Sequence, residues 1–167
     1  MKPSRLLLAL IGGLLALAIV LGSLPLLSIK LPQTLQPLWW GLLLALLLIA
    51  AADALWLRRL PTPRLQRQLP GNLPLGRWSE VRLTLHHDYR QPLAVQAFDH
   101  LPEHMDFEFM PQQVELHPGE QTEFGYRVRP LKRGHFRIPR CELLLPSPLR
   151  LWQARRFIDQ ASETRVY

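Results

Sequence analysis

The hydrophobic pattern divides the chain into a front part of continuous apolar stretches and a longer part in which apolar and polar residues alternate. Residues 6–27 and 38–57 are the two apolar stretches, and Asp53 is the one acidic or basic residue within them. Each stretch is close to the ~20 residues that a helix needs to cross the hydrocarbon core of a bilayer. We therefore expect residues 1–58 to form a two-helix transmembrane hairpin.

From residue 78 to the end, the alternation has the period of two that is typical of half-buried β-strands. Val81, Leu83 and Leu85, for example, alternate with polar side chains. Turn residues recur about every ten positions, as in antiparallel sandwiches and unlike βαβ units. We predict an all-β domain over residues 78–167, an immunoglobulin-like antiparallel β-sandwich of roughly seven to nine strands. The strand segments are 81–85, 93–97, 105–109, 114–116, 124–128, 136–138, 141–145, 149–152 and 157–158.

Residues 59–77 join these two parts and are rich in proline. Pro61, Pro63, Pro70 and Pro74 all lie in this segment. Proline has no backbone N–H to donate and clashes with the preceding helical turn, so a regular helix is excluded here. We predict a proline-rich linker that also contains the first strand.

The charge distribution predicts the orientation of the hairpin. The sequence has 20 Lys and Arg residues against 13 Asp and Glu residues, a formal net charge of +7. The second apolar stretch is followed at once by Arg58, Arg59, Arg64 and Arg67, whereas the loop between the stretches carries Lys30 alone. Cytoplasmic flanks of membrane helices are enriched in Lys and Arg. We therefore expect both termini, and with them the β domain, to be cytoplasmic.

A second interpretation treats the first apolar stretch as a cleavable signal peptide, because Lys2 and Arg5 precede it. The stretch is long for that role, and no small-x-small cleavage site closes it. Even after cleavage, the second stretch would keep the β domain in the cytoplasm. Cys141 is the single cysteine, so no intramolecular disulfide can form, which agrees with a reducing compartment.

Aromatic and basic residues mark the expected membrane interfaces. Trp39 and Trp40 stand at the outer start of the second stretch, and Trp56, Arg58 and Arg59 stand at its inner end. Indole rings favour the boundary between hydrocarbon and water, and arginines favour the cytoplasmic side. We expect these five residues to act as membrane-interface anchors.

Two further features lie within the apolar stretches. Asp53 is roughly 6 Å from the inner end of its helix, so we expect it to reach headgroup water and the arginines beyond, in a structural role rather than on a proton or ion path. The pairs Gly12/Ala16 and Gly41/Ala45 space small residues four apart. Such pairs allow close helix packing or self-association of the hairpin, although they are also ordinary in Leu-rich helices.

Four segments give the chain a resemblance to a known bacterial family. They are residues 126–130 (YRVRP), 133–136 (RGHF), 147–152 (SPLRLW) and 166–167 (VY). In this order they resemble the amino-terminal part of the domain of unknown function 58 family, in which a two-span hairpin precedes a β-sandwich. The resemblance extends over the entire chain. Gly134 suits a turn with positive φ, and Tyr126, Phe136 and Trp152 are expected core aromatics, whereas Arg150 stands where the family often has a small residue.

The resemblance also implies a partner. Members are commonly encoded beside MoxR-type AAA+ ATPases, so the chain is expected to work at the inner membrane with such an ATPase, in envelope or metalloprotein assembly. The family continues into a carboxy-terminal von Willebrand factor A-like domain, which this sequence lacks together with its acidic and Ser metal-ligand motif. No metal site is therefore expected.

Basic residues gather around one predicted hairpin of the β domain, namely Arg127, Arg129, Lys132, Arg133 and Arg137. We predict that they form a docking surface for a protein partner. Anionic lipid or nucleic acid is the alternative partner for such a surface. The plain structural interpretation is a solvated strand face, because glutamates are interleaved with these residues.

The sequence shows no catalytic constellation, so we expect a protein without enzymatic activity and without a cofactor. Glycine-rich phosphate loops are absent. His100 and His104 have a spacing that suits metal ligands on a helix, but Leu-Pro-Glu between them predicts a turn. The alternative is a membrane-tethered thiol hydrolase or transferase in which His135 activates Cys141. A lone cysteine in a strand is more often a small core residue.

Overall fold

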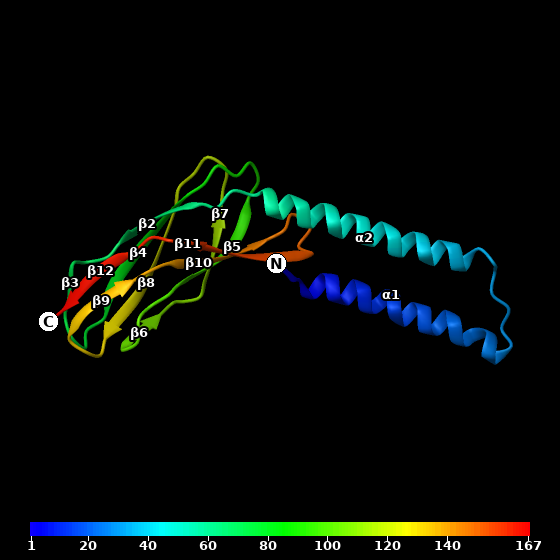
Figure 1. The fold of residues 1–167 in the computed structure, drawn as a ribbon, viewed down its shortest axis with the longest axis horizontal. Coiled ribbons are helices and arrows are strands. Elements are labelled where there is room, and N and C mark those ends of the chain that lie inside the picture. Colours follow the sequence, from blue (N-terminus) through cyan, green and yellow to red (C-terminus); the bar gives the residue numbers. More distant parts are fainter. The chain divides into compact units, whose positions relative to one another are not determined.

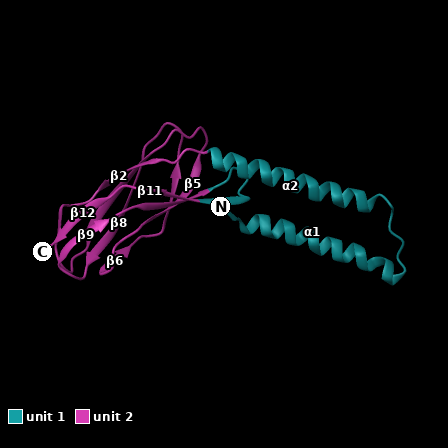
Figure 2. Cartoon of the chain, in the orientation of Figure 1, with its two compact units in different colours: residues 1–59, 146–154 teal, residues 60–145, 155–167 magenta.

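The computed structural model describes residues 1–167 and separates into two compact units (Figure 2). Unit 1 consists of residues 1–59 together with 146–154, and unit 2 consists of residues 60–145 and 155–167. The division differs from the predicted boundary because a segment close to the carboxyl end belongs to the helical unit. That segment, residues 146–154, contains the motif SPLRLW at residues 147–152.

Unit 1 contains the two predicted helices. Helix α1 spans Arg5–Ser23 and continues as the 3-10 turn η1 (Leu24–Leu27), and helix α2 spans Leu35–Arg59 (Figure 1). Ser4 caps α1, because its hydroxyl accepts a hydrogen bond from the Leu7 amide at 3.2 Å. Both helices are long and apolar enough to cross a membrane.

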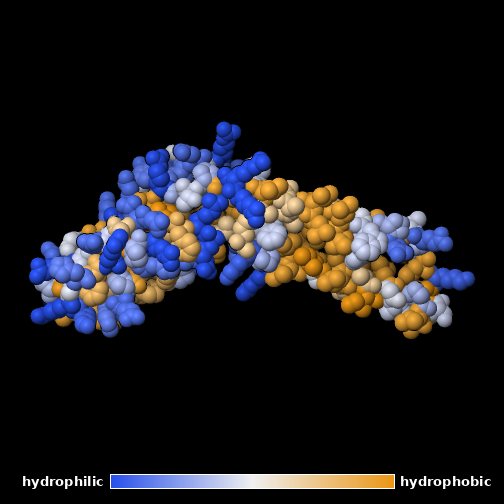
Figure 3. Space-filling view, viewed as in Figure 1, coloured by the Kyte–Doolittle hydropathy of each residue, from blue (hydrophilic) through white to orange (hydrophobic).

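On the face shown in Figure 3, the middle of the helical part is largely hydrophobic. Ile19, Leu44 and Leu48 are 73%, 59% and 62% exposed. The small residues do not bring the helices together, because a Cβ placed on Gly12 or Gly41 would meet no atom within 4 Å. The expected close packing at these glycines is therefore wrong.

Unit 2 is built from antiparallel β-sheets, apart from one short parallel pair between β3 and β12. One sheet has the order β2-β4-β8-β6 and another has β3-β12-β9, whereas the third has β1-β11-β10-β5-β7, in which β1 (Lys2–Pro3) pairs with the first two residues of β11 (Figure 1). The strands are β2 (Arg64–Gln68), β3 (Asn72–Leu73), β4 (Ser79–His86), β5 (Leu93–Asp99), β6 (Met105–Glu108), β7 (Gln112–Leu116), β8 (Thr122–Pro130), β9 (Gly134–Ile138), β10 (Cys141–Pro146), β11 (Trp152–Ile158) and β12 (Ser162–Val166).

The predicted alternation forms the core of unit 2. Val81 pairs with Tyr126 and Leu83 pairs with Phe124 across β4 and β8, and all four side chains are buried. Successive side chains of a strand point to opposite faces, so one face of each strand supplies the core. The other buried apolar residues of unit 2 are Leu65, Leu73, Leu85, Tyr89, Val95, Ala97, Met105, Val114, Leu116, Val128, Ile138, Cys141, Leu143, Leu145 and Val166.

The structure differs from the predicted strand pattern in several places. Strands β2 to β12 outnumber the predicted seven to nine, because β2, β3 and β12 are short or polar and lack a clear alternation. Phe107 and Phe109 are 42% and 63% exposed, and β6 ends at Glu108, since Phe109 has a left-handed φ of 68°. Residues 149–151 are a turn and not a strand. The predicted positive φ at Gly134 is confirmed, at 143°.

Candidate tether and docking surfaces

The turn between β10 and β11, residues 146–151, contacts both helices within unit 1. The Ser4 amide donates to the Leu151 carbonyl at 2.8 Å, just before α1 begins. The short strand β1 (Lys2–Pro3) pairs with the first two residues of β11. The Trp152 indole donates to the Ala50 carbonyl of α2 at 2.8 Å. The start of α1 and the last turns of α2 are therefore held by one turn.

An apolar cluster packs the turn against the helices. Leu7, Ala50 and Leu151 are 3%, 5% and 4% exposed, and the side chains of Leu46 and Trp152 pack on them, as does that of Ile11. Trp152, one of the expected core aromatics, thus belongs to this cluster in unit 1. Burial of these side chains stabilises the contact between the turn and the helices by about 25 cal/mol for each Å² of apolar surface that is removed from water.

Asp53 is the polar centre of this contact. It is only 4% exposed, and its carboxylate accepts hydrogen bonds from the Ser147 hydroxyl and, at 3.1 Å, from the Leu149 amide. The Ser147 hydroxyl in turn accepts a hydrogen bond from the Trp152 amide at 3.0 Å. The expectation that Asp53 reaches headgroup water is therefore wrong, because the turn satisfies its oxygens instead. Sequence reasoning missed this partner, which lies 94 residues away along the chain.

The residues that we expect to act as membrane-interface anchors lie at both ends of α2. Trp39 and Trp40 contact each other edge to face with centroids 5.0 Å apart, and the Trp39 indole donates to the Leu14 carbonyl of α1 at 3.1 Å. Trp56 is 58% exposed at the other end, beside Arg58 and Arg59 in the last turn. Trp39 therefore also links the two helices, a role that the sequence analysis did not predict.

A buried ion pair joins the sheets of unit 2. The Arg67 guanidinium binds Asp99 through two bonds, Nε to Oδ2 at 2.8 Å and Nη2 to Oδ1 at 2.5 Å, and both side chains are 0% exposed. The Tyr126 hydroxyl donates to the same carboxylate at 2.6 Å. Arg67 also donates to the Ser162 hydroxyl at 3.0 Å and to the Gln160 carbonyl. Arg67 was counted among the cations that follow the second apolar stretch, and the structure shows that its side chain is buried in unit 2.

Two of the five predicted docking cations lie on β8 and are already paired. Arg129 binds Asp106 at 2.5 Å, and Arg127 lies 3.6 Å from Glu108, each across the β6–β8 ladder. Both guanidinium groups also lie over the Trp78 ring, at 5.0 and 5.6 Å from its centroid. These neighbours offset the positive charge of β8, which is why sequence reasoning overestimated this part of the surface.

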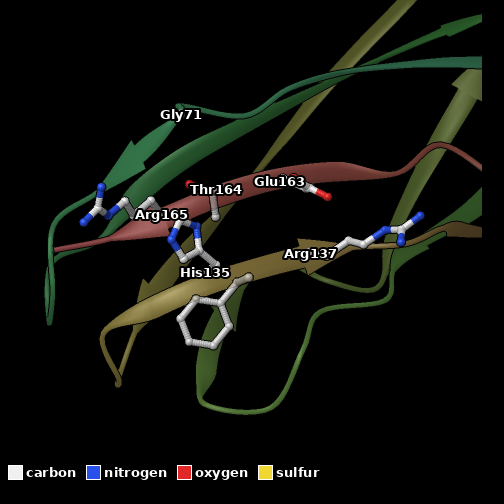
Figure 4. A pocket seen from close by; sticks show the side chains of 7 residues that line it. Gly71, His135, Arg137, Glu163, Thr164 and Arg165 are labelled. Atoms are coloured by element: carbon white, nitrogen blue, oxygen red, sulfur yellow. The ribbon is translucent and has the colours of Figure 1, made fainter.

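The other three cations lie further along the chain and are more available. Lys132 and Arg133 are exposed in the turn between β8 and β9, and Arg137 is exposed on β9. Arg137 faces Glu163 of β12 in the register, and His135 faces Arg165. A shallow hollow of about 360 Å³ is lined by these two facing pairs of β9 and β12 together with Gly71 (Figure 4). The remaining lining residues are Phe136 and Thr164.

The candidate thiol is buried, His100 is paired with a carboxylate, and His104 lies in a turn. Cys141 is 0% exposed, and burial raises the pKa of its thiol to about 12 from an ordinary 9.0, with Asp99 adding to the shift. Its sulfur approaches the Glu142 carbonyl at 3.9 Å. His100 binds the Glu142 carboxylate at 2.9 Å, while His104 lies in a turn with a φ of 67°. No group of three or more His, Cys, Asp or Glu side chains is arranged to hold a metal ion.

Two tyrosines share the raised pKa of Cys141. Burial raises the pKa of Tyr89 to about 12, and its hydroxyl donates to the Pro61 carbonyl at 2.6 Å. Burial, followed by the neighbouring Asp99 carboxylate, raises the pKa of Tyr126 well above its ordinary value. In the folded chain these acids therefore stay neutral at pH values where the unfolded chain would ionise them.

Stability should accordingly fall on the alkaline side. Well below pH 9 all three groups are protonated in both states, and their effect on stability is constant; as the pH approaches 9 and rises towards 12, the unfolded state loses protons that the folded state keeps. The free energy of unfolding should drop by up to about 1.4 kcal/mol per pH unit for each fully buried group. Urea unfolding between pH 8 and 11 would measure the slope, and Cys141→Ala should reduce it from pH 9 upward. A flat profile above pH 9 would contradict the shifts.

Comparison with known proteins gives structural similarity without a family. No protein-family model matches the chain, and no curated protein matches it. Among solved structures, the chain is similar to Escherichia coli alpha-2-macroglobulin from domain MG7 to the C-terminus, with a TM-score of 0.49 and 17% identity over 65% of this chain and 17% of that one. The chain thus spans less than a fifth of that protein.

Two smaller solved proteins are matched over most of their own length. The CARDB domain of a Pyrococcus furiosus protein in complex with di-metal ions has a TM-score of 0.40 and 10% identity over 65% of this chain and 91% of that one. A FixG-related protein from Vibrio parahaemolyticus has a TM-score of 0.39 and 9% identity over 63% and 94%. At such identities the similarity does not extend to function.

Proposed function

We propose that this chain is a membrane-anchored, non-enzymatic protein-interaction module, with α1 and α2 crossing the bacterial inner membrane as a hairpin and an immunoglobulin-like β-sandwich in the cytoplasm. The observation that carries the anchoring is the outward exposure of large apolar side chains along both helices. Such a surface is unfavourable in water and suits the acyl chains of a bilayer. The exposed apolar side chains of the two helices include Leu8, Leu10, Leu15, Leu17, Ile19, Val20, Leu42, Leu44, Leu47, Leu48 and Leu55.

The cytoplasmic orientation is supported by the cations at the ends of the hairpin. Lys2 and Arg5 flank the start of α1, and Arg58 and Arg59 end α2, while the connecting loop carries Lys30. Because the start of α1 and the last turns of α2 contact the same turn, these four cations lie at one end of the hairpin. Four basic residues at one end against one at the other support a cytoplasmic location for the β domain by the positive-inside rule, even without Arg67.

The proposed docking surface is the turn between β8 and β9 with the adjoining face of β9, and it comprises Lys132, Arg133, His135 and Arg137. Three of these are cations for which no ion pair is formed within unit 2, in contrast to Arg127 and Arg129. Their charge favours an acidic segment of a partner protein. The resemblance to the domain of unknown function 58 family suggests a MoxR-type AAA+ ATPase as that partner.

The test is capture of the purified ATPase encoded nearest to this gene by the full chain in detergent micelles. The variant Lys132→Glu/Arg133→Glu should lower the amount of bound ATPase at least about tenfold, because two attractive charges become repulsive. Arg82→Glu/Arg90→Glu is the matched control, since both arginines are exposed outside the proposed surface. That control should bind like the unmodified chain.

Four outcomes would count against parts of this function. Equal loss of the ATPase in both double variants would indicate general charge attraction, and no binding by the unmodified chain would remove the partner. Tight binding to anionic vesicles or single-stranded RNA with a steep salt dependence would favour the alternative basic-module function. A reporter fused to Tyr167 that is active only outside the cytoplasm would contradict the orientation.

A further inference from the structure

We infer that the turn between β10 and β11 is a third membrane-contacting element, whose tip enters the headgroup layer of the inner leaflet beside the hairpin. The partner is a phospholipid surface, and Asp53 is the residue that positions the turn. The inference rests on the proposed membrane anchoring, because it requires α1 and α2 to lie in a bilayer. All of the residues involved belong to unit 1 (Figure 2).

The depth of the turn follows from its contacts with α2. The Trp152 indole binds the Ala50 carbonyl, and Ala50 precedes Arg58 by eight residues, which is about 12 Å along a helix. A headgroup layer is only about 5–8 Å thick on each side of the hydrocarbon. If Arg58 lies among the headgroups, Trp152 lies near the boundary of the hydrocarbon. The turn before Trp152 lies at a similar depth, because Ser147 and Leu149 bind Asp53 of α2.

Backbone amides of the turn donate hydrogen bonds within the protein, as a low-water environment requires. The amide of Ser147 donates to the Trp152 carbonyl at 2.9 Å, and that of Arg150 donates to the Ser147 carbonyl at 2.9 Å. The amide of Leu149 binds the Asp53 carboxylate, and that of Trp152 binds the Ser147 hydroxyl. Irregular backbone is tolerated at membrane depth only where such groups are satisfied within the protein.

The tip of the turn has the composition of an interfacial insertion. Pro148, Leu149 and Arg150 are its exposed residues, and Leu149 is 53% exposed. In this arrangement the side chains of Pro148 and Leu149 lie below the headgroups, and the Arg150 guanidinium lies at the level of the phosphates. Long basic side chains at an interface extend towards water in this way. Arg150, which departs from the small residue of the resembling family, thereby acquires a lipid-facing role.

Asp53 has a consistent place in this arrangement. A carboxylate within an apolar span is costly unless it is paired or hydrogen-bonded. Here it binds one hydroxyl and one amide of the turn, so its polarity is used to fix a β-turn against a membrane helix. Without Asp53 the Leu149 amide and the Ser147 hydroxyl would need water as their hydrogen-bond acceptor. The turn would then move toward the aqueous phase.

The test measures the depth of Leu149 directly in the full chain. Single cysteines replace Leu149, Leu44 or Arg133 in a Cys141→Ala background, and each is labelled with bimane and reconstituted into phosphatidylcholine vesicles. Brominated phosphatidylcholines quench bimane at short range, either near the headgroups or near the bilayer centre. The lipid brominated near the headgroups should quench the Leu149 label at least about fivefold more than the Arg133 label. The lipid brominated near the centre should quench the Leu44 label.

The outcomes separate this inference from the proposed function. If the Leu44 label is not quenched, the helices do not lie in the bilayer and the anchoring itself fails. If the Leu44 label is quenched but the Leu149 label is quenched no more than the Arg133 label, the anchoring stands and the inserted turn is wrong. Addition of Asp53→Ala to the Leu149→Cys protein should reduce quenching by the lipid brominated near the headgroups, and unchanged quenching would overturn the positioning role of Asp53.

Discussion

Replacement of Asp99 by alanine should destabilise the β domain by about 3–5 kcal/mol, the usual cost of removing one partner from a buried ion pair. Asp99 holds the Arg67 guanidinium through two bonds and accepts a third from Tyr126. Both charged side chains are fully buried, so the variant leaves a guanidinium without its counter-charge and without water. The loss is comparable to a large part of the stability of an ordinary domain.

Urea unfolding of the full chain in detergent, followed by circular dichroism of the β-sheets, measures this effect. Glu80→Ala is the matched control, because it also removes a carboxylate from an arginine, but the Glu80–Arg82 pair is 58% and 63% exposed. Surface pairs contribute only about 0–1 kcal/mol. Tyr126→Phe should fall between the two variants, since it removes one hydrogen bond and leaves the ion pair intact. Equal stability of the Asp99 and Glu80 variants would show that the cluster is not coupled to folding.

Alkylation of Cys141 should be at least roughly a thousandfold slower in the folded chain than in the unfolded chain near neutral pH, because the thiolate is the reactive form. The pKa of about 12, against an ordinary 9.0, lowers the thiolate fraction by about three powers of ten. Complete burial of the side chain adds a barrier to access. The measurement compares iodoacetamide labelling with and without urea, with mass spectrometry as the readout.

The thiol-enzyme alternative makes the opposite prediction. Under that alternative, folded protein would label rapidly, and His135→Ala would slow the reaction because His135 would be the base. We expect His135→Ala to leave the rate unchanged. Glu120→Cys in a Cys141→Ala background is the positive control, since Glu120 is exposed in a turn and its replacement should label at the rate of an ordinary thiol. Rapid, His135-dependent labelling of Cys141 would revive the enzymatic alternative.

Much of the local structure could be predicted from the alternation of side chains. Val81, Leu83 and Leu85 are buried as expected, as are Tyr126 and its neighbours on β8, because a period of two puts every second residue on the core face. The pattern failed at Phe107 and Phe109, where the strand ends early and both rings are exposed. Two-residue strands such as β3 offer too few positions for any period to appear.

The candidate surfaces were predicted less completely than the fold. The charge count treated Arg67, Arg127 and Arg129 as available cations, although Arg67 is buried and the other two face carboxylates across a ladder. Pairing of this kind depends on strand register, which a single sequence does not reveal. Of the exposed cations that form no ion pair within unit 2, Lys132 and Arg133 lie in the turn between β8 and β9, and Arg137 lies on β9 across from Glu163 of β12.

The sequence by itself determined the two apolar helices, the alternating strands and the placement of the tryptophans at the ends of the second helix, because helix length and side-chain period are local properties. Only the tertiary structure decided what the polar residues do. Asp53 meets Ser147, and Arg67 meets Asp99, across 94 and 32 positions of the chain. Such partners are fixed by how distant segments pack, and burial then turns a charge that would otherwise be solvated into a specific contact.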